Sequence, residues 1–562
     1  MTDMGFTKEY KKSVELIHYE VDERLYEVEI DKIIPKSLSE QIKLPLYKYV
    51  EKFENGEKYY YVFQPQNELK RLTEIIPELD YEKVKLITEK LLKLLVEVEN
   101  NRFKFFMLAP DSIYIDQNYT PYIFLYYPVY YENANYEWNR LEIPIKIVTK
   151  DYSLETRNSQ LISELFSYML FKDDYRRQER KDRPKFAVEK MRERGYFDVA
   201  RWLEVSYRNS YKLSDCLERY RIALENEDKR TLKTNDQAPA KYKTASYSFL
   251  GRAKIKETDD YEETSKVNQD AYVEKRIDKM KMYLIAVMDG VSTSAIGNGN
   301  EASQIAKKAL VEMFLNTTWS NVDDITSDEV EDFFRKYIEK ANSEIVQRAL
   351  DIAKEEGKSI QRTSDIMATT FTGVLVINDR FYMCSVGDSP CYIFNKEEIK
   401  RINIEHNSRT ENLLKGFGST ENKALTEVLG KARKTDDSIQ PETPKYHFVH
   451  GRILPGELIA VMSDGVIDFS KGSFNDEKEE NFKSLFFEKY EQNRKLKQTV
   501  VDVLKEIDNS NAGDNITLCV LEPIFPTDET SNTDKRIFRN INEYQNLNQR
   551  FSRKENHKNY GR

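Results

Sequence analysis

Four aspartates in the second half of the sequence share one setting. Each stands beside a glycine at the end of an apolar, strand-like run: Asp289, Asp388, Asp464 and Asp514. Asp-Gly is a favoured turn dipeptide, so turn formation is the favoured explanation of any single pair. Four such pairs in one segment favour a second interpretation, in which several strand ends meet at one rim. Carboxylates gathered there would repel one another unless cations lay between them.

This chemistry would suit Mg²⁺ or Mn²⁺, which prefer oxygen ligands and keep several waters. The neighbouring glycine would let the backbone come close, so that its carbonyl oxygen could ligate as well. The residues alone leave both interpretations open, because nothing in their spacing shows that the strand ends converge.

The elements that must position these aspartates follow a clear order. Apolar runs of strand length occur at residues 283–288, 371–377, 381–386, 391–394, 458–462 and 516–521. Helical patterns over 301–315 and 328–356 lie between the first two runs, and Thr326 with Glu329 predicts a capping box for the second helix. Because strands and helices do not alternate one by one, the pattern predicts an α+β sandwich rather than a parallel sheet.

In order along the chain, short motifs of this segment resemble those of the metal-dependent serine/threonine protein phosphatases of type 2C, the PPM family. Asn-Gln-Asp-Ala at 268–271, Val-Met-Asp-Gly at 287–290 and Gly-Asp-Asn-Ile-Thr at 513–517 carry much of the likeness. The other matching motifs lie at 369–370, 386–389, 405–406, 425–430, 455–457 and 462–465. Each motif is weak alone, but the ordered set over residues 247–522 is specific.

The resemblance implies two antiparallel β-sheets packed face to face with helices outside, and a site for two Mn²⁺ or Mg²⁺ ions, with a third in bacterial members. The metal-site residues that it implies are Asp289, Gly290, Asp464, Asp514, Asp388 and Asp270. In that site Asp289 bridges two ions and Gly290 adds a carbonyl. Asp464 and Asp514 complete the coordination of the first ion. Asp388 matches the accessory site, and Asp270 lies behind the ligands or near the accessory ion.

The implied activity is hydrolysis of phosphoprotein monoesters. Water activated between two ions attacks phosphorus in line, without a covalent phosphoenzyme. The catalytic residues are then Asp289, Asp464 and Asp514.

The sequence departs from the family pattern at several positions. Ser265 stands where the family usually carries a phosphate-clamping Arg, and Lys266 beside it is the candidate cation for the substrate phosphate. Pro390 replaces another Arg, and the turn after Gly290 is altered at 291–294. These changes favour an alternative function, a degenerate phosphatase fold that binds phosphoproteins or partners without efficient catalysis. The retained aspartates favour the enzyme, since such a cluster would otherwise repel for no gain.

The length of 562 residues predicts more than one domain. We expect an N-terminal domain at 1–226, a polar linker at 227–245, the phosphatase-like domain at 246–523 and a basic, disordered tail at 524–562. In the first of these, helical patterns cover residues 81–98, 159–171 and 214–225, and a strand covers 58–63.

Residues 44–225 bear a fainter resemblance to the large lobe of a protein kinase. Pro110 matches a proline of the catalytic loop, but Met107 and Ser112 stand where the catalytic Asp and a metal-binding Asn belong. The glycine-rich loop is also missing, so the resemblance implies a pseudokinase-like domain that steers substrate or activity. An unrelated α+β binding domain is the alternative.

Composition and charge argue against several other classes of protein. A net charge of −9 argues against broad attraction to nucleic acid, and four scattered cysteines argue against structural zinc or a disulfide framework. No apolar run has the length of a membrane span, and the start lacks a secretory pattern. We therefore expect a cytoplasmic protein whose partners are a phosphoprotein substrate and, with it, a protein kinase or the targets of that kinase.

Overall fold

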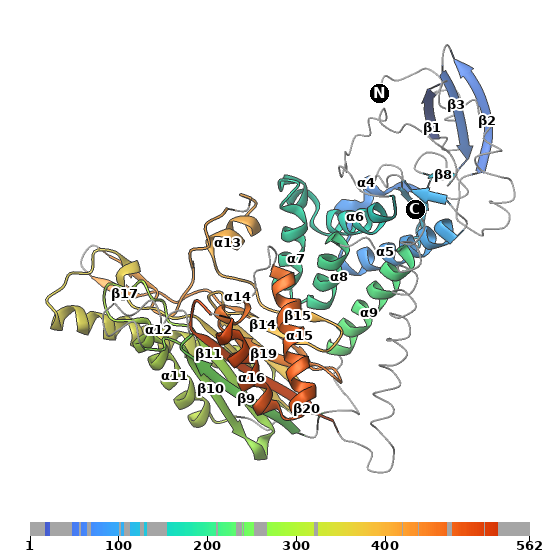
Figure 1. Cartoon of the computed structure of the whole chain (residues 1–562). Helices are drawn as coiled ribbons and strands as arrows, with labels where there is room; N and C mark the ends of the chain where they lie inside the picture. The colour runs from blue at the N-terminus through green and yellow to red at the C-terminus, as the bar shows by residue number, and fades with distance from the viewer. Residues whose placement is uncertain are drawn as a thin grey trace, which may run out of the picture.

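The computed structural model contains two packed regions joined at a charged junction (Figure 1). It describes residues 17–22, 48–55, 58–64, 69–100, 103–105, 113–123, 129–131, 154–208, 212–231, 239, 241–251, 267–319, 324–418, 420–435, 438–468, 475–510 and 512–525. Within these residues, no helix is long and apolar enough to cross a membrane.

The larger region is a sandwich of two five-stranded sheets in which every pairing is antiparallel. The first sheet has the order β10 (Ala271–Ile277), β11 (Met282–Met288), β12 (Phe371–Ile377), β13 (Arg380–Val386) and β18 (His447–Arg452). The second has the order β15 (Ile399–Arg401), β14 (Cys391–Phe394), β19 (Leu458–Met462), β20 (Ile516–Ile524) and β9 (Lys241–Phe249). The predicted sandwich fold is confirmed.

Residues of β11 alternate between two apolar layers. Ile285 and Val287 pack between the sheets against Val461 and Cys519, whereas Leu284 and Ala286 belong to the layer under the helices. This period of two is what a strand buried on both faces requires. It also explains why β11 reads as a continuous apolar run.

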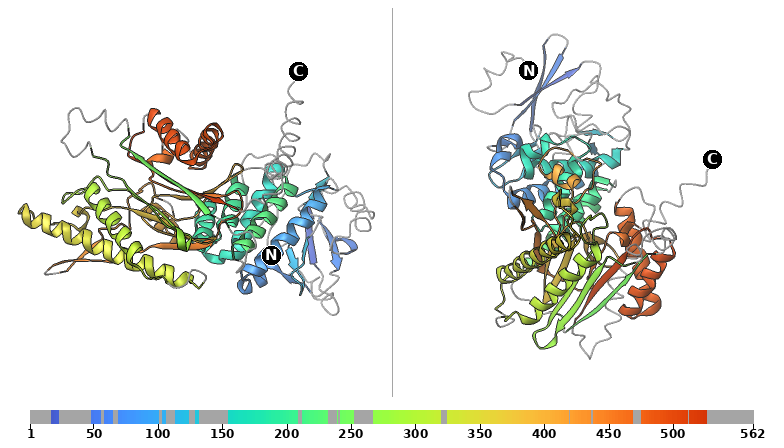
Figure 2. Two further views of the ribbon diagram at one scale, coloured as in Figure 1. Left: turned by 90° about the horizontal axis from the view of Figure 1, so that it is seen from below. Right: turned by 90° about the vertical axis from the view of Figure 1, so that its left-hand side faces the viewer.

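Helices cover both outer faces of the sandwich (Figure 2). α11 (Gly299–Asn316) and α12 (Ser327–Glu355) pack on the first sheet, and α15 (Asn475–Asn493) and α16 (Leu496–Asn509) pack on the second. The capping box of Thr326 and Glu329 is present at the start of α12, as predicted. Shorter elements complete the region: η7 (Asp278–Met280), η8 (Thr363–Asp365), α13 (Ser408–Leu414), β16 (Ala432–Lys434), β17 (Ile439–Pro441) and α14 (Gly465–Asp468).

The smaller region is mainly helical. Its helical block consists of α5 (Tyr81–Asn100), α6 (Leu154–Arg177), α7 (Arg183–Glu193), α8 (Phe197–Arg208) and α9 (Leu213–Thr231). Short elements flank it: α4 (Leu72–Ile75), η3 (Ile76–Glu78), and the strands β4 (Lys70–Arg71), β5 (Phe103–Phe105), β6 (Ile113–Ile115), β7 (Pro121–Ile123) and β8 (Val129–Tyr131). A separate sheet has the order β1 (Ile17–Asp22), β3 (Lys58–Gln64) and β2 (Lys48–Asn55).

The predicted helices of this region are confirmed as α5, α6 and α9, and the predicted strand as β3. α7 and α8 were not predicted, because charges such as Glu189, Arg192 and Glu204 suggest an exposed segment. In the fold these three side chains are buried and paired. The kinase-like positions Met107, Pro110 and Ser112 and the basic tail lie outside the described residues, so those interpretations stay predictions.

The predicted linker at 227–245 needs correction at both ends. α9 continues to Thr231, and β9 begins at Lys241 as an edge strand of the second sheet. The start of this stretch looked like linker because it is polar, but Glu227 and Arg230 are buried and hydrogen-bonded. Polar residues paired across a junction carry no local sign of their burial.

A cluster of four buried charges joins the two regions, and we call it the junction cluster. It consists of Asp198 and Arg230 from the helical block and Lys400 and Glu457 from the sandwich. Arg230 bonds Asp198 at 2.5 Å and Glu457 at 2.6 Å, and Lys400 bonds Asp198 at 2.7 Å. Apolar contacts add to the junction, since Phe197 of α8 packs with the inter-sheet layer. The helical block is therefore packed on the sandwich rather than tethered to it.

Candidate active site

Strand register brings two of the predicted acids together at one edge of the first sheet. Ala271 of β10 pairs with Met288 of the antiparallel β11. Asp270, just before β10, and Asp289, just after β11, therefore lie at the same end of the strand pair. Thr370 lies beside them, where its hydroxyl accepts a hydrogen bond from the Asp289 N–H at 3.1 Å. Its own N–H donates to the Asp289 carbonyl at 2.8 Å. The Asp289 backbone is thus fixed by the neighbouring strand.

The second sheet supplies its acids at the same rim. Met462 of β19 pairs with Leu518 of β20, which puts Asp464 after one strand and Asp514 before the other. The two sheets meet where the Thr517 hydroxyl donates to Asp270 Oδ2 at 2.6 Å. The other oxygen of the same carboxylate, Oδ1, is buried and makes no hydrogen bond within the described residues.

Four of the acids at the rim, Asp289, Asp270, Asp464 and Asp388, share a raised pKa. Burial, followed by the negative charges of its neighbours Asp270, Asp464, Asp514 and Asp388, raises the pKa of Asp289 well above its usual range. Burial and nearby acids raise the pKa of Asp270 and that of Asp464 to about 6, and that of Asp388 to about 7. A carboxylate responds in this way when desolvation and like charges are not offset by a cation. We call Asp270, Asp289, Asp388, Asp464 and Asp514 the rim acids.

Two glycines of the Asp-Gly pairs are needed for close packing. A Cβ on Gly290 would lie 2.4 Å from the Gly299 carbonyl oxygen and 2.7 Å from that of Gln269. A Cβ on Gly465 would lie 2.4 Å from the Asn515 carbonyl oxygen. These contacts are too short for any side chain, so glycine at these positions lets neighbouring segments approach the rim.

The donor set fits hard divalent cations. It offers carboxylate and carbonyl oxygens only, carries excess negative charge and leaves Asp270 Oδ1 without a partner. Within the described part of the chain, no group of three or more His, Cys, Asp or Glu side chains is arranged to hold a metal ion, so the rim offers a loose set of oxygen donors. Such a set suits Mg²⁺ or Mn²⁺, which keep several waters, better than an ion that demands complete enclosure by protein.

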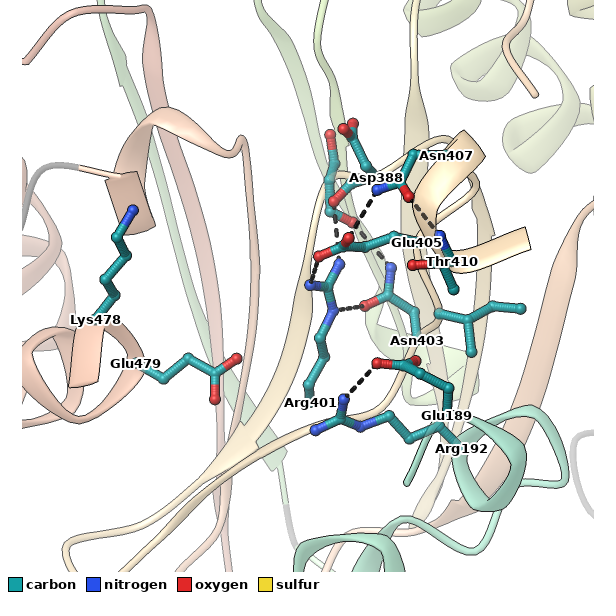
Figure 3. A network of polar contacts seen from close by, with 12 residues as sticks. Glu189, Arg192, Asp388, Arg401, Asn403, Glu405, Asn407, Thr410, Lys478 and Glu479 are labelled. Carbon is teal, nitrogen blue, oxygen red and sulfur yellow. Dashed lines mark hydrogen bonds and ion pairs between the residues drawn. The ribbon is translucent and has the colours of Figure 1, made fainter. Parts of the chain in front are cut away.

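Behind Asp388 lies a buried polar network that the sequence interpretation missed (Figure 3). Arg401 donates to the Asp388 carbonyl at 3.1 Å and bonds Glu405 at 2.5 Å. Asn407 in turn donates to Glu405 at 2.7 Å. The local signal in the sequence was Arg401, four residues before Glu405. This spacing could not be interpreted without knowing that β15 ends at Arg401.

His406 has a structural role. Its Nδ1 accepts a hydrogen bond from the Gly387 N–H at 3.1 Å, and its backbone N–H donates to the Gly387 carbonyl at 2.9 Å. Burial lowers the pKa of His406 to about 4, so the imidazole is neutral near pH 7. The candidate phosphate ligand Lys266 and the neighbouring Ser265 lie outside the described residues.

Several known protein phosphatases are similar to the sandwich region of this chain. Residues 260–507 match the family model described as Protein phosphatase 2C. A putative protein phosphatase of Mycoplasma genitalium is 24% identical over 241 residues, which cover 42% of this chain and 84% of that protein. Protein phosphatase PhpP of Streptococcus pneumoniae serotype 2 is 26% identical over 216 residues, which cover 37% of this chain and 76% of that protein.

Among solved structures, the serine/threonine phosphatase of S. agalactiae has 20% sequence identity and a TM-score of 0.37. The match covers 50% of this chain and 99% of that one. The family model and the curated relatives agree with each other: residues 260–507 form a region similar to the protein phosphatases of type 2C.

Proposed function

We propose that the chain hydrolyses phosphoserine and phosphothreonine in proteins with the help of Mn²⁺ or Mg²⁺ ions held by the rim acids. The observation that carries the proposal is the convergence of the buried Asp270 with the half-buried Asp289, Asp388 and Asp464, whose pKa values are raised by desolvation and by nearby acids. Such a cluster lowers the stability of the fold unless cations offset it. Its retention therefore supports a function that needs cations.

Each rim acid has a distinct place in this proposal. Asp289 would lie between two ions with the Gly290 carbonyl beside it, and Asp464 and Asp514 would complete the first ion. Asp388 would serve an accessory ion, and Asp270 would orient the site from behind. Bound ions would supply the Lewis acid that activates water for in-line attack and offsets charge on the phosphoryl group.

The chain itself supplies order and exclusion of water. Thr370 fixes the backbone of Asp289, and Thr517 orients Asp270 through a 2.6 Å hydrogen bond. Asp270 is 5% exposed and is therefore shielded from bulk water. Groups held before the reaction begins need no reorganisation as charge develops, which is how a preorganised site lowers a barrier. Lys266 would add a cation for the substrate phosphate.

A second candidate function is a regulator that binds phosphoproteins without efficient turnover. The observation that favours it is the loss of the phosphate-clamping Arg at Ser265 and of the Arg at Pro390. In either case we propose that the N-terminal region steers substrate or activity, because the helical block is packed directly on the sandwich. The kinase or kinase target that shares the substrate would then be a partner.

Hydrolysis of p-nitrophenyl phosphate and of a phosphothreonine peptide, measured with Mn²⁺ and with EDTA, tests the proposal. We expect turnover with Mn²⁺ that EDTA abolishes and that Asp464→Asn removes. Asp332→Asn is the matched control, since it makes the same change on the outer helix α12. Peptide binding without Mn²⁺-dependent turnover in the wild type would favour the regulator instead.

A further inference from the structure

Helix α13 connects the sandwich to the helical block. It lies between β15 and β18, within the sandwich sequence, yet its Leu413 is fully buried in the apolar core of the helical block. α13 packs against α7 in that core. A segment of the phosphatase region is thus anchored in the other region.

The start of α13 leads back to the rim through consecutive polar contacts. The Asn407 side chain caps the helix by accepting from the Thr410 N–H at 2.9 Å, and its amide donates to Glu405 at 2.7 Å. Glu405 bonds Arg401 at 2.5 Å, and Arg401 donates to the Asp388 carbonyl at 3.1 Å. The path therefore runs from the core of the helical block to one of the rim acids (Figure 3).

α7 contributes charge to the same path. Burial opposes ionisation of Glu405, but Arg401 and then Lys185 of α7 hold its pKa at about 2. Glu189 and Arg192, also on α7, form a 3.0 Å ion pair beside Arg401 in Figure 3. Glu405 is thus held between a cation of the sandwich and a cation of the helical block.

We propose that the helical block, acting through α13, Glu405 and Arg401, positions Asp388 and so sets the affinity of the rim for its accessory divalent cation. Arg401 is a positioning residue in this scheme, since it contacts the backbone of Asp388 and not an ion. The inference rests on the proposed function, because it takes Asp388 as a residue of the cation site.

Mn²⁺ binding to the full-length protein, measured by isothermal titration calorimetry, tests the inference without reference to activity. Arg401→Gln should weaken one Mn²⁺ binding step by about 10-fold or more, as the loss of an outer hydrogen-bond partner does at other metal sites. The step assigned to Asp289 should keep its affinity. Arg335→Gln is the matched control, because Arg335 also forms ion pairs with acids but on the surface of α12.

Two milder variants test the path from the helical block. Leu413→Ala removes packing in the other region, and Asn407→Ala removes the cap and the bond to Glu405. Both should weaken the same binding step as Arg401→Gln, by about 3-fold or more if the path is continuous. Loss of a single helix cap lowers stability only modestly, so Asn407→Ala should remain folded even where the other two variants do not.

The outcomes separate this inference from the proposed function. If the wild type bound no Mn²⁺, or if Asp289→Asn bound it as the wild type does, the cation site itself would be wrong. If Asp289→Asn lost binding while folded Asn407→Ala kept every step within 2-fold of the control, the cation site would stand and the positioning role would be overturned.

Discussion

Two charge clusters of this molecule differ in the signs of the charges that they gather. The junction cluster is buried and pairs two acids with two bases, whereas the rim, from the buried Asp270 to the exposed Asp514, gathers acids. At the junction, burial disfavours the charged form of Asp198, but Arg230 and Lys400 hold its pKa at about 2. At the rim, burial and like charges act together and raise the pKa of Asp289.

The difference separates structure from function. Complementary charges at the junction satisfy one another within the protein and hold two regions together. Like charges at the rim repel one another unless something from outside, such as a cation, offsets them. The direction of the pKa shift follows this difference, since the pKa falls for Asp198 at the junction and rises for Asp289 at the rim.

The largest expected effect comes from Asp289→Asn. Loss of a bridging charge should reduce Mn²⁺-dependent hydrolysis by about 10³-fold, since a metal site supplies several kcal/mol and each 1.36 kcal/mol is a factor of ten. Without divalent cations the same variant should unfold at an equal or higher urea concentration than the wild type, because one repelling charge is gone. A variant with near-normal turnover, or one clearly less stable without cations, would remove the distinction between the clusters.

Arg230→Met should instead lower the stability of the fold, whether or not Mn²⁺ is present. It leaves Asp198 and Glu457 buried without their shared partner, and breaking a buried pair in this way costs about 3–5 kcal/mol. Urea unfolding followed by tryptophan fluorescence should show the loss with or without Mn²⁺.

Arg335→Met is the control for that loss. Its side chain is 43% exposed and pairs with Asp332 and Glu339 on the surface of α12. Exposed pairs contribute about 0–1 kcal/mol, so its midpoint should barely move. Equal losses in the two variants would mean that burial at the junction adds nothing.

The two clusters also differed in how far the sequence predicted them. Four of the rim acids could be proposed from local order, because each sits beside a strand end and a glycine, whereas Asp270 has no neighbouring glycine and was implied only by the family resemblance. The junction could not, because Arg230 and Glu457 are 227 residues apart and Asp198 and Lys400 are 202 apart. Nothing near Arg230 distinguishes it from the exposed bases around it, and the same stretch was therefore taken for linker.

Glu227 sharpens the comparison because it is a buried acid that belongs to neither cluster. It accepts hydrogen bonds from the Tyr81 hydroxyl at 2.8 Å and the Val199 N–H at 3.1 Å. Burial raises its pKa to about 7, with a further rise from Asp198 that Tyr81, Val199 and Lys85 oppose. A raised pKa without a cluster of like charges should therefore affect stability and leave activity alone.

The sign of the effect follows from linkage. A carboxyl whose pKa is raised on folding stabilises the protein fully below its unfolded pKa, near 4.5, and this stabilisation is lost as pH rises toward 7. The side chain in Glu227→Gln cannot ionise, so this variant does not lose stability as pH rises through that range. Relative to wild type it should therefore gain about 1–2 kcal/mol in unfolding free energy between pH 5 and pH 8. Urea unfolding at both pH values measures the gain, with the exposed Glu82→Gln as a control that should show none. A gain in both variants, or a matching change in Mn²⁺-dependent turnover for Glu227→Gln, would show that an isolated buried acid is not separable from the rim.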